Sequence, residues 1–517
     1  MPPKAHVKTQ LVSRPAKEIV ASTPETRASL HYSLRNRKLR KIARGLYTTN
    51  LTDPLEDIVR RNLWHIAAQF FPSALIADRT AIESRAAPDG SVFLVADRGR
   101  PLSLPGVNFW PRRGAAPIPE SDRPFIDGLF MSSQARALLD NLHSSRERRH
   151  VPRTLRQKGV EQYLEKVLRN AGEATVNRLR DEAKQIAPLI GREREAALLS
   201  KIIGAMMGTQ SAKLESPAAI ARGKGDGYDP DRIELFELLR ADLASQAFPE
   251  RIARKDMQYL PFFEAYFSNF IEGTEFEVDE AYRVVYEGEI PAGRPEDAHD
   301  VIGTFNIVAD SVERARTAST ADEFLNLLRA HHAALLGGRP ERRPGQFKIK
   351  SNKVGSTIFV APELVRGTLK RGFEMLATLQ FPMAQAIFAT FLVSEVHPFD
   401  DGNGRLARIA MNAHLSAANQ TRIIIPTVFR TEYLQALRTL SHNQNTQSLV
   451  RVIDFAQKYV QEIDFSSYEG ARLQLEKTNA FSDPADAMGD SPKLILPSRL
   501  LWFQGYAPDT DLDNSSS

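Results

Sequence analysis

The twelve residues HPFDDGNGRLAR, residues 397–408, decide the interpretation of this sequence. The run before them, which starts at Pro382, is apolar almost all round and predicts a buried helix with a proline in its first turn. His397 precedes Pro398, and a residue before proline is pushed out of the helical conformation. We therefore expect the His397 imidazole to leave the end of that helix at the floor of a cleft.

The second half of this stretch predicts an anion site at the start of another helix. Residues 401–404 form a tight turn whose glycines can take positive φ and aim successive N–H groups at one point. Arg405 and Arg408 are three apart, so we expect both guanidiniums on the same face, leaning over that turn. A base, an oxygen ligand, backbone donors and two arginines are the groups that phosphoryl or nucleotidyl transfer needs. An ordinary helix–turn–helix explains a short DGNG turn, but it does not explain the whole string.

The same string resembles the signature of the Fic family, HPFx[D/E]GNGRxxR, at every specified position. The resemblance implies an all-helical core and transfer of AMP from ATP to a protein hydroxyl, which is called AMPylation. It implies that His397 deprotonates the target hydroxyl, that Phe399 anchors the loop, and that Asp401 holds Mg²⁺. The phosphate-binding residues that it implies are Gly402, Asn403, Gly404, Arg405 and Arg408, with the two arginines at the β/γ end.

An upstream motif predicts control of this site. Ser268 and Glu272 lie in SNFIEG, which resembles the family's inhibitory-helix motif, [S/T]xxxE[G/N]. A glutamate beside Arg408 would form a bidentate pair and take the place of an ATP γ-phosphate. The resemblance also implies that the same glutamate can align water for AMP removal. The alternative is an amphipathic helix with Glu272 near its end.

Residues 347–362 resemble the flap of the family, a hairpin whose exposed edge pairs with a target peptide. Its predicted target-binding residues are Thr357, Ile358 and Phe359. An unremarkable surface hairpin is the alternative. Farther on, Tyr433 and either Asn443 or Asn445 lie where members of the family contact adenine or ribose.

The amino-terminal half is basic near its start. Arg37, Lys38, Arg40, Lys41 and Arg44 precede a Gly45 turn, and the string resembles the winged-helix start of AbiEi-type antitoxin regulators. A basic helix followed by a wing would bind operator DNA, first through its phosphates. The alternative is a charged helix face on a structural domain. Residues 146–158 predict a solvated linker or a second phosphate contact.

Composition limits the remaining choices. The 517 residues are 42% apolar and 25% charged, which is typical of a globular protein, and the formal net charge is only +5. There is no cysteine, so disulfides, thiolate metal sites and cysteine nucleophiles are excluded. No apolar run reaches the length of a membrane span, and the first residues lack the apolar core of a signal peptide. We expect a protein of the cytoplasm that has no membrane partner.

The predicted fold is mainly α, with an all-helical Fic core and a β-hairpin flap after an α+β, winged-helix-like amino-terminal region. The predicted segments are a disordered arm (1–28), an AbiEi-like α+β region (29–145), a helical region (146–210), a linker (211–232), the Fic domain (233–465) and a partly disordered tail (466–517).

The predicted activity is autoinhibited adenylyl transfer from ATP, with Mg²⁺, to a Ser, Thr or Tyr hydroxyl of another protein or of the chain itself. The amino-terminal region suggests a DNA-associated module, of toxin–antitoxin type. Three alternatives stay open: a DNA-binding regulator with a nucleotide-sensing core, a Fic enzyme using another nucleotide donor, and a de-AMPylase.

Overall fold

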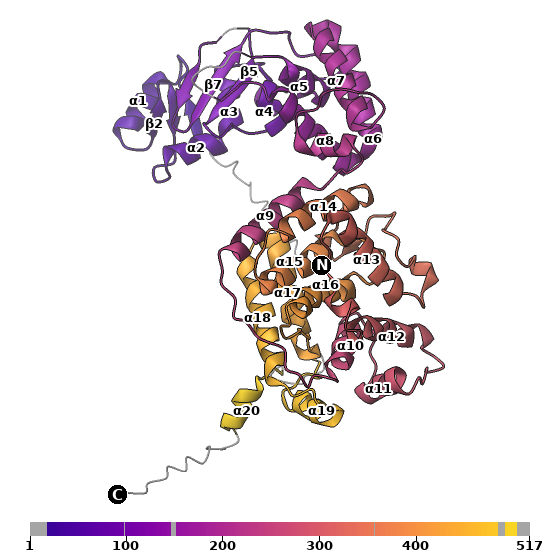
Figure 1. Cartoon of the computed structure of the whole chain (residues 1–517). Coiled ribbons are helices and arrows are strands. Elements are labelled where there is room, and N and C mark those ends of the chain that lie inside the picture. Colours follow the sequence, from indigo (N-terminus) through magenta and orange to yellow (C-terminus); the bar gives the residue numbers. More distant parts are fainter. Residues whose placement is uncertain (1–17, 98, 146–150, 356, 484–491, 504–517) are drawn as a thin grey trace, which may run out of the picture. The chain divides into compact units, whose positions relative to one another are not determined.

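The computed structural model describes residues 18–97, 99–145, 151–355, 357–483 and 492–503. The chain forms two compact units, residues 1–225 and residues 226–517 (Figure 1). The first unit carries both larger sheets and the second is mainly helical, as the sequence predicts. Within the described residues, no helix has the length and apolar character needed to span a bilayer.

The first unit begins with a small three-stranded antiparallel sheet of order β1-β3-β2. Strand β1 (Ile19–Ala21) falls in the predicted arm, of which residues 1–17 lie outside the described residues. Helix α1 (Arg27–Arg35) packs on the hairpin of β2 (Arg40–Ala43) and β3 (Leu46–Thr48) through Leu30, Leu39 and Tyr47.

The expected basic helix is wrong, because the basic string lies after α1 and on β2. Gly45, at φ +79°, closes the hairpin, and pairing with β3 fixes the string as a strand. Arg40 donates to the Asp53 carbonyl, whereas the other members of the string are exposed: Arg37, Lys38, Lys41 and Arg44.

A mixed six-stranded sheet of order β6-β7-β5-β4-β9-β8 follows. Its strands are β4 (Leu75–Ile76), β5 (Ser91–Val95), β6 (Leu102–Leu104), β7 (Val107–Arg112), β8 (Arg123–Pro124) and β9 (Phe130–Met131). The β5–β7 and β4–β9 pairs are parallel, and the others are antiparallel. Helices α2 (Leu55–Arg61) and α3 (Leu63–Phe70) pack apolar residues such as Ile58 and Ile66 against this sheet. Helix α4 (Asp78–Glu83) follows β4 directly.

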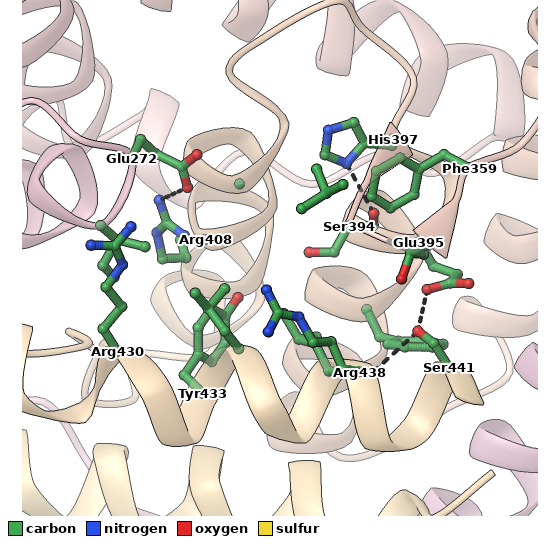
Figure 2. A pocket seen from close by; sticks show the side chains of 17 residues that line it. Glu272, Phe359, Ser394, Glu395, His397, Arg408, Arg430, Tyr433, Arg438 and Ser441 are labelled. Carbon is green, nitrogen blue, oxygen red and sulfur yellow. Dashed lines mark hydrogen bonds and ion pairs between the residues drawn. The ribbon is translucent and has the colours of Figure 1, made fainter. Parts of the chain in front are cut away.

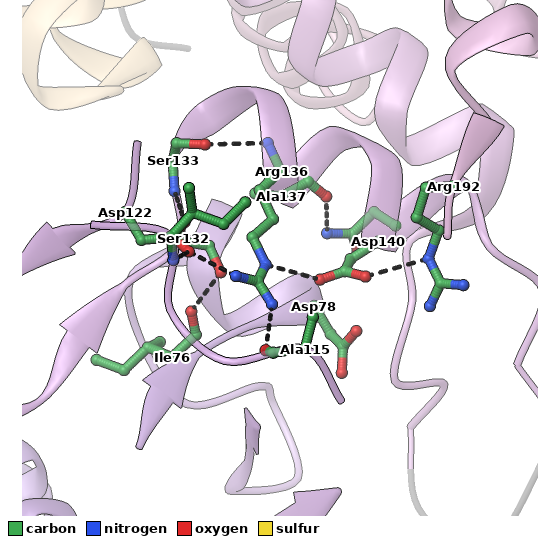
Figure 3. A network of polar contacts seen from close by, with 12 residues as sticks. Ile76, Asp78, Ala115, Asp122, Ser132, Ser133, Arg136, Ala137, Asp140 and Arg192 are labelled. Carbon is green, nitrogen blue, oxygen red and sulfur yellow. Dashed lines mark hydrogen bonds and ion pairs between the residues drawn. The ribbon is translucent and has the colours of Figure 1, made fainter. Parts of the chain in front are cut away.

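A buried network of charges joins this sheet to helix α5 (Gln134–Leu142) (Figure 3). Arg136 is 1% exposed; it pairs with Asp122 at 2.5 Å and donates to the carbonyls of Ala115 and Ala116. Asp140 lies between Arg112 at 3.1 Å and Arg192 at 3.4 Å. Buried carboxylates are tolerated when they are paired in this way.

Helices α6 (Arg156–Ile190) and α7 (Glu193–Met206) cover the predicted helical region, with a kink at Gly172 in α6. The segment predicted as a linker contains a third helix, α8 (Pro217–Gly223), capped by Ser216. The buried Glu161 carboxylate accepts from the Ser216 N–H, and Glu165 pairs with Arg222. These tertiary contacts hold a glycine-containing segment in a helix that its composition does not predict.

The second unit is built on two consecutive buried helices, α15 (Pro382–Val396) and α16 (Asn403–Ala417). Pro382 stands in the first turn of α15, and Phe388 and Phe391 are among its fully buried residues. Around them lie α9 (Pro230–Ala244), α13 (Ala321–Leu335), α14 (Val365–Leu376), α17 (Arg430–Asn443) and α18 (Thr446–Glu462).

A second core surrounds α10 (Leu260–Ile271), the predicted inhibitory helix. Helices α11 (Val278–Tyr286) and α12 (Pro295–Ala309) pack on it, and so does α19 (Tyr468–Lys477), which lies in the predicted tail. The Tyr468 ring stacks on Phe263, and Phe481 stacks on Phe267. The sequence does not predict helix α19 in this segment, because a helix this short shows no clear hydrophobic periodicity. Its apolar residues pack on α10, which is distant in the sequence. Helix α20 (Pro497–Phe503) follows, and residues 484–491 and 504–517 lie outside the described residues.

Candidate active site

A cavity of about 350 Å³ opens between the end of α15, the start of α16, α10 and α17 (Figure 2). The predicted residues His397, Gly404, Arg408 and Glu272 all line it. The flap residues Thr357 and Phe359 line it too. The structure therefore brings the predicted inhibitory motif, the flap and the loop of residues 397–408 to one cavity. Together these motifs extend over more than 100 residues of the chain.

His397 ends α15 in the left-handed conformation, with φ 51° and ψ 60°. It leaves the helical conformation as expected, although a residue before proline usually takes an extended backbone instead. Its Nδ1 lies 3.2 Å from the Ser394 carbonyl, and the Phe359 ring stacks on the imidazole at 3.9 Å. When Nδ1 carries the proton and donates to that carbonyl, the Nε2 lone pair is left free to accept a proton. Burial lowers the pKa of His397 to about 4, so the neutral ring is the stable form.

The backbone around His397 is held by the segment that leads into the flap. Lys348 donates from its backbone N–H to the Pro398 carbonyl and from Nζ to the Val396 carbonyl, at 2.9 and 3.3 Å. Asn352 Nδ2 donates to the Phe399 carbonyl at 3.0 Å. A strained positive φ at a non-glycine residue persists only where its surroundings fix it, and these contacts do so. Burial lowers the pKa of Lys348 to about 7.

Two buried rings also support the loop from the side of α13. His332 stacks on Phe399 at 3.8 Å and has Nε2 3.1 Å from the Asp401 carbonyl. Asn403 bonds to both the N–H and the carbonyl of Phe399 through its side chain, at 2.9 Å each. Asn403 therefore braces the loop with its amide, and only its backbone N–H is left for a bound anion.

Arg408 and Glu272 meet at one end of the cavity. Arg408 is 4% exposed; its Nη2 lies 2.8 Å from Glu272 Oε1, and its Nε donates to Ser268 Oγ at 3.0 Å. A Cβ on Gly404 would lie 2.1 Å from Glu272 Oε1, so this carboxylate rests directly on the first turn of α16. Glu272 and Arg408 are in contact, but through one nitrogen and one oxygen rather than as the predicted bidentate pair, because Arg408 Nε is bound to Ser268. The carboxylate also lies at the positive helix terminus.

The expectation that Arg405 shares the anion site with Arg408 is wrong for its side chain. Arg405 pairs with Asp300 of α12 at 2.7 Å and donates to Asn269 of α10 at 3.1 Å. It is 3% exposed, and Asp300 is 1% exposed. Three positions on a helix turn the side chain by about 60° from Arg408, and here that turn points Arg405 into the α10–α12 interface.

Asp401 stands at the rim of the loop with 37% of its side chain exposed. Its Oδ1 accepts from the Gly402 N–H at 2.7 Å, and Gly402 has φ 71°. Among the described residues, no group of three or more histidines and carboxylates could hold a metal ion. A hard cation at Asp401 would need most of its oxygen ligands from a bound phosphate and water, which is common for Mg²⁺.

The flap is a short antiparallel hairpin of β10 (Lys353–Val354) and β11 (Thr357–Ile358). Ile358 is 66% exposed on it, and Thr357 Oγ1 lies 2.8 Å from His442 Nε2 at the end of α17. Tyr433 lines the cavity as expected. Neither Asn443 nor Asn445 lines it, and the Asn445 side chain accepts from the Ser448 N–H as the cap of α18.

The end of the cavity farthest from Glu272 contains residues that sequence reasoning missed: Glu395, Arg438 and Ser441. Ser441 Oγ bonds to Glu395 Oε2 at 2.5 Å, and Arg232 of α9 lies 2.9 Å from Glu395 Oε1. Their only signal in the sequence is a glutamate on an otherwise apolar helix, which predicts a buried charge that needs a partner.

Fold and site together define a helical domain in which a partly buried histidine, a buried arginine and the start of a helix border one cavity. Residues 323–415 match the model of the Fic/DOC family. The match covers most of α13, the flap, α14, α15 and most of α16.

Two curated relatives extend this match beyond the domain. The chain is 25% identical over 223 residues to protein adenylyltransferase fic-1 of Caenorhabditis elegans, covering 42% of this chain and 43% of that protein. It is 24% identical over 230 residues to protein adenylyltransferase Fic of Drosophila melanogaster, covering 44% and 46%. The chain thus spans less than half the length of the curated relatives that it matches.

Among solved structures, Fic-1 (aa134 - 508) from C. elegans aligns with 58% of this chain and 93% of that chain, at 19% identity and a TM-score of 0.34. The similarity to the Fic/DOC family rests on the match of residues 323–415 and on the curated relatives.

Proposed function

We propose that the second unit is a protein adenylyltransferase that moves AMP from ATP to a Ser, Thr or Tyr hydroxyl, on another protein or on this chain. The observation that supports this most is the His397 ring, whose Nδ1 faces the Ser394 carbonyl while the ring borders a cavity that also holds Arg408. The curated relatives are named protein adenylyltransferases, which agrees with this chemistry.

The chemistry needs one base and one anion site. Bound phosphates would lie against the first turn of α16 and Arg408, where backbone donors and a guanidinium stabilise negative charge. The hydroxyl proton passes to His397 Nε2 as the hydroxyl oxygen bonds to the α-phosphorus. The bond from that phosphorus to the bridging oxygen breaks, and pyrophosphate leaves.

Mg²⁺ fits this proposal through Asp401, a partly exposed carboxylate in the loop before α16 whose Oδ2 lies 3.6 Å from Arg342 Nε. When bound, the cation neutralises charge on the phosphates. The protein's own part is to hold the Asp401 loop, through His332 on the Asp401 carbonyl and through the Asn403 amide on Phe399.

We infer that this enzyme is autoinhibited by Glu272. Its carboxylate pairs with the guanidinium of Arg408 and lies over Gly404. A terminal phosphate of a bound nucleotide would take the same place. A nucleotide can bind only if that carboxylate moves or if the nucleotide's phosphates take another path. Moving the carboxylate costs free energy, and another path misaligns the α-phosphate, so both lower transfer activity.

The test is transfer of label from α-³²P-ATP with Mg²⁺ in cell lysate, comparing the wild type, Glu272→Gly and Glu272→Gly/His397→Ala. We expect label in protein with Glu272→Gly only. Label that persists in the double variant contradicts the role of His397. Equal label in the wild type and Glu272→Gly contradicts inhibition.

Three alternatives give different results in the same assay. If the enzyme uses another nucleotide donor, adding that nucleotide without label should lower the amount of label transferred to protein. A de-AMPylase would remove label from a modified target. A nucleotide-sensing regulator would bind ATP in every variant but transfer nothing.

A second function is proposed for the first unit, binding of DNA by its basic hairpin. Residues 27–52 contain seven Lys and Arg and no Asp or Glu, and Lys41 and Arg44 are exposed on the hairpin. Such a surface attracts phosphates and gives salt-dependent affinity. Lys41→Gln/Arg44→Gln should weaken binding to a DNA duplex and flatten its salt dependence; unchanged binding would contradict this role.

A further inference from the structure

The second unit carries a group of tyrosines outside the cavity described above, which we call the tyrosine cluster. Its members are Tyr259 before α10, Tyr282 and Tyr286 on α11, and Tyr468 at the start of α19. They are four of the twelve tyrosines of the chain. The centroids of neighbouring rings are 6.2, 4.6, 4.2 and 6.2 Å apart, passing from Tyr259 to Tyr286, Tyr282, Tyr468 and back. Three segments that are distant in the sequence thus form one aromatic surface.

The tyrosine cluster is fixed by the core and yet reaches the surface. The buried Phe262 ring lies 5.7–5.9 Å from the rings of Tyr282, Tyr286 and Tyr468. The Tyr468 hydroxyl donates to Asp279 at 2.8 Å. Tyr286 is nevertheless 41% exposed, and the other three members are partly exposed. Aromatic side chains held in this way offer contact area and lose little conformational entropy when a partner binds.

The charges around the tyrosine cluster are mainly negative. Residues 275–289 contain six Asp and Glu and one Arg. That arginine, Arg283, lies 3.1 Å from Glu289. Arg472, one helical turn after Tyr468, lies 2.8 Å from Asp279. Both arginines are therefore already matched by carboxylates of the protein.

Two carboxylates that act on the rings have no such partner. Among the described residues, no lysine or arginine lies within ion-pair distance of Glu287 or Glu469. Burial raises the pKa of Tyr282, and its neighbours Tyr259, Glu287 and Glu469 raise it further. The negative charge of the two carboxylates thus reaches the rings, where it favours the approach of a cation.

An aromatic face attracts a cation through the quadrupole of its ring. A guanidinium suits such a face better than an ammonium, because it is planar and more weakly hydrated. We propose that the tyrosine cluster, together with Glu287 and Glu469, is a docking site for an arginine side chain on an exposed segment of a partner protein. The guanidinium stacks on the tyrosine rings, and the two carboxylates balance its charge. The site shares no residue with the cavity, so the proposal is independent of the transfer reaction.

The test measures the binding of labelled peptides to the full chain by fluorescence anisotropy at physiological salt. The peptides share a Gly/Ser-rich sequence and carry arginine, lysine or citrulline, which has the shape of arginine without its charge. We expect the arginine peptide to bind about tenfold more tightly than the citrulline peptide, and more tightly than the lysine peptide. Equal affinity for the arginine and citrulline peptides overturns the proposal. A lysine peptide that binds as tightly as the arginine peptide overturns the assignment to arginine.

Tyr286→Leu tests the aromatic part of the site, because it removes the most exposed ring of the cluster. We expect it to bring the affinity for the arginine peptide close to the affinity for the citrulline peptide. Tyr32→Leu is the matched control. It removes a ring of the first unit that is 68% exposed on α1, and it should leave every affinity unchanged.

Glu287→Gln/Glu469→Gln tests the charged part and leaves every ring in place. It should weaken the binding of the arginine and lysine peptides alike, by about fivefold. Glu237→Gln, an exposed position on α9, is the control for the loss of a surface charge and should have no effect. Unchanged binding in the double variant overturns the proposal, whether or not Tyr286→Leu folds. Arginine binding that falls in the double variant but not in a folded Tyr286→Leu protein would show an acidic surface without an aromatic site, and this result also overturns it.

Discussion

The charge network of the first unit and the cavity of the second unit differ in how their arginines are matched. In the first unit, Arg136 is enclosed by Asp122 and by backbone carbonyls, so its charge is matched within the protein. In the cavity of the second unit, Arg430 and Arg438 have no carboxylate within ion-pair distance among the described residues. Arg408 is matched only by Glu272, whose side chain is 28% exposed.

The difference separates charges that hold a fold from charges that await a ligand. A matched buried pair contributes to the unique packing of its domain, and removing one partner leaves the other uncompensated. Guanidiniums that face a cavity, with one half-exposed partner that can move, are suited to an incoming anion. Residue type alone does not distinguish the two cases, but the geometry of the partners does.

The largest effect expected from this comparison is on stability, in the first unit. Arg136→Ala leaves Asp122 buried without its arginine partner, so the free energy of unfolding of this unit should fall by about 3–5 kcal/mol. Hydrogen exchange of peptides from residues 74–142 in increasing urea measures this locally. Exchange that matches the wild type would mean that the network contributes nothing to the fold.

Arg408→Ala should act on the ligand and little on the fold. In the Glu272→Gly background it removes a charged partner of phosphate, and ATP affinity should fall by about 1.5–3 kcal/mol, or ten- to a hundredfold. Arg405→Ala is the matched control, three residues away on α16 and bound to Asp300. We expect it to lower thermal stability and to spare ATP affinity in the fraction that stays folded. The opposite pattern would exchange the roles of the two arginines.

Arg405 and Arg408 show how much of the site can be predicted from the sequence. The loop could be predicted in detail, because a pre-proline histidine, a glycine turn and a helix start are local features. Which guanidinium faces the cavity depends on Asp300 in another helix, about 100 residues earlier, and no local pattern reports that. Ser441 and Arg232 were missed for the same reason, since only tertiary packing joins them at Glu395.

A smaller effect is expected where Glu272 meets Gly404. An added Cβ at Gly404 would lie 2.1 Å from Glu272 Oε1, so Gly404→Ala must displace the carboxylate. In a double-mutant cycle, Gly404→Ala should destabilise the Glu272 protein more than the Glu272→Gly protein, with a coupling energy of about 1 kcal/mol. Thermal melts of the four proteins measure it. Additive changes would mean that the carboxylate does not rest on this turn in solution.

The smallest effect at neutral pH concerns the protonation of His397. Burial lowers its pKa from an ordinary value near 6.5 to about 4, so the base form persists well below pH 6. The acid limb of label transfer by Glu272→Gly should therefore lie near pH 4, and the rate should change little between pH 6 and 8. Phe359→Ala removes the ring that stacks on the imidazole, which exposes it to water and should move that limb toward pH 6.5. An acid limb near pH 6.5 in the Glu272→Gly protein without Phe359→Ala would show that water reaches His397 during the reaction. Water rather than protein groups would then stabilise the charges in the cavity.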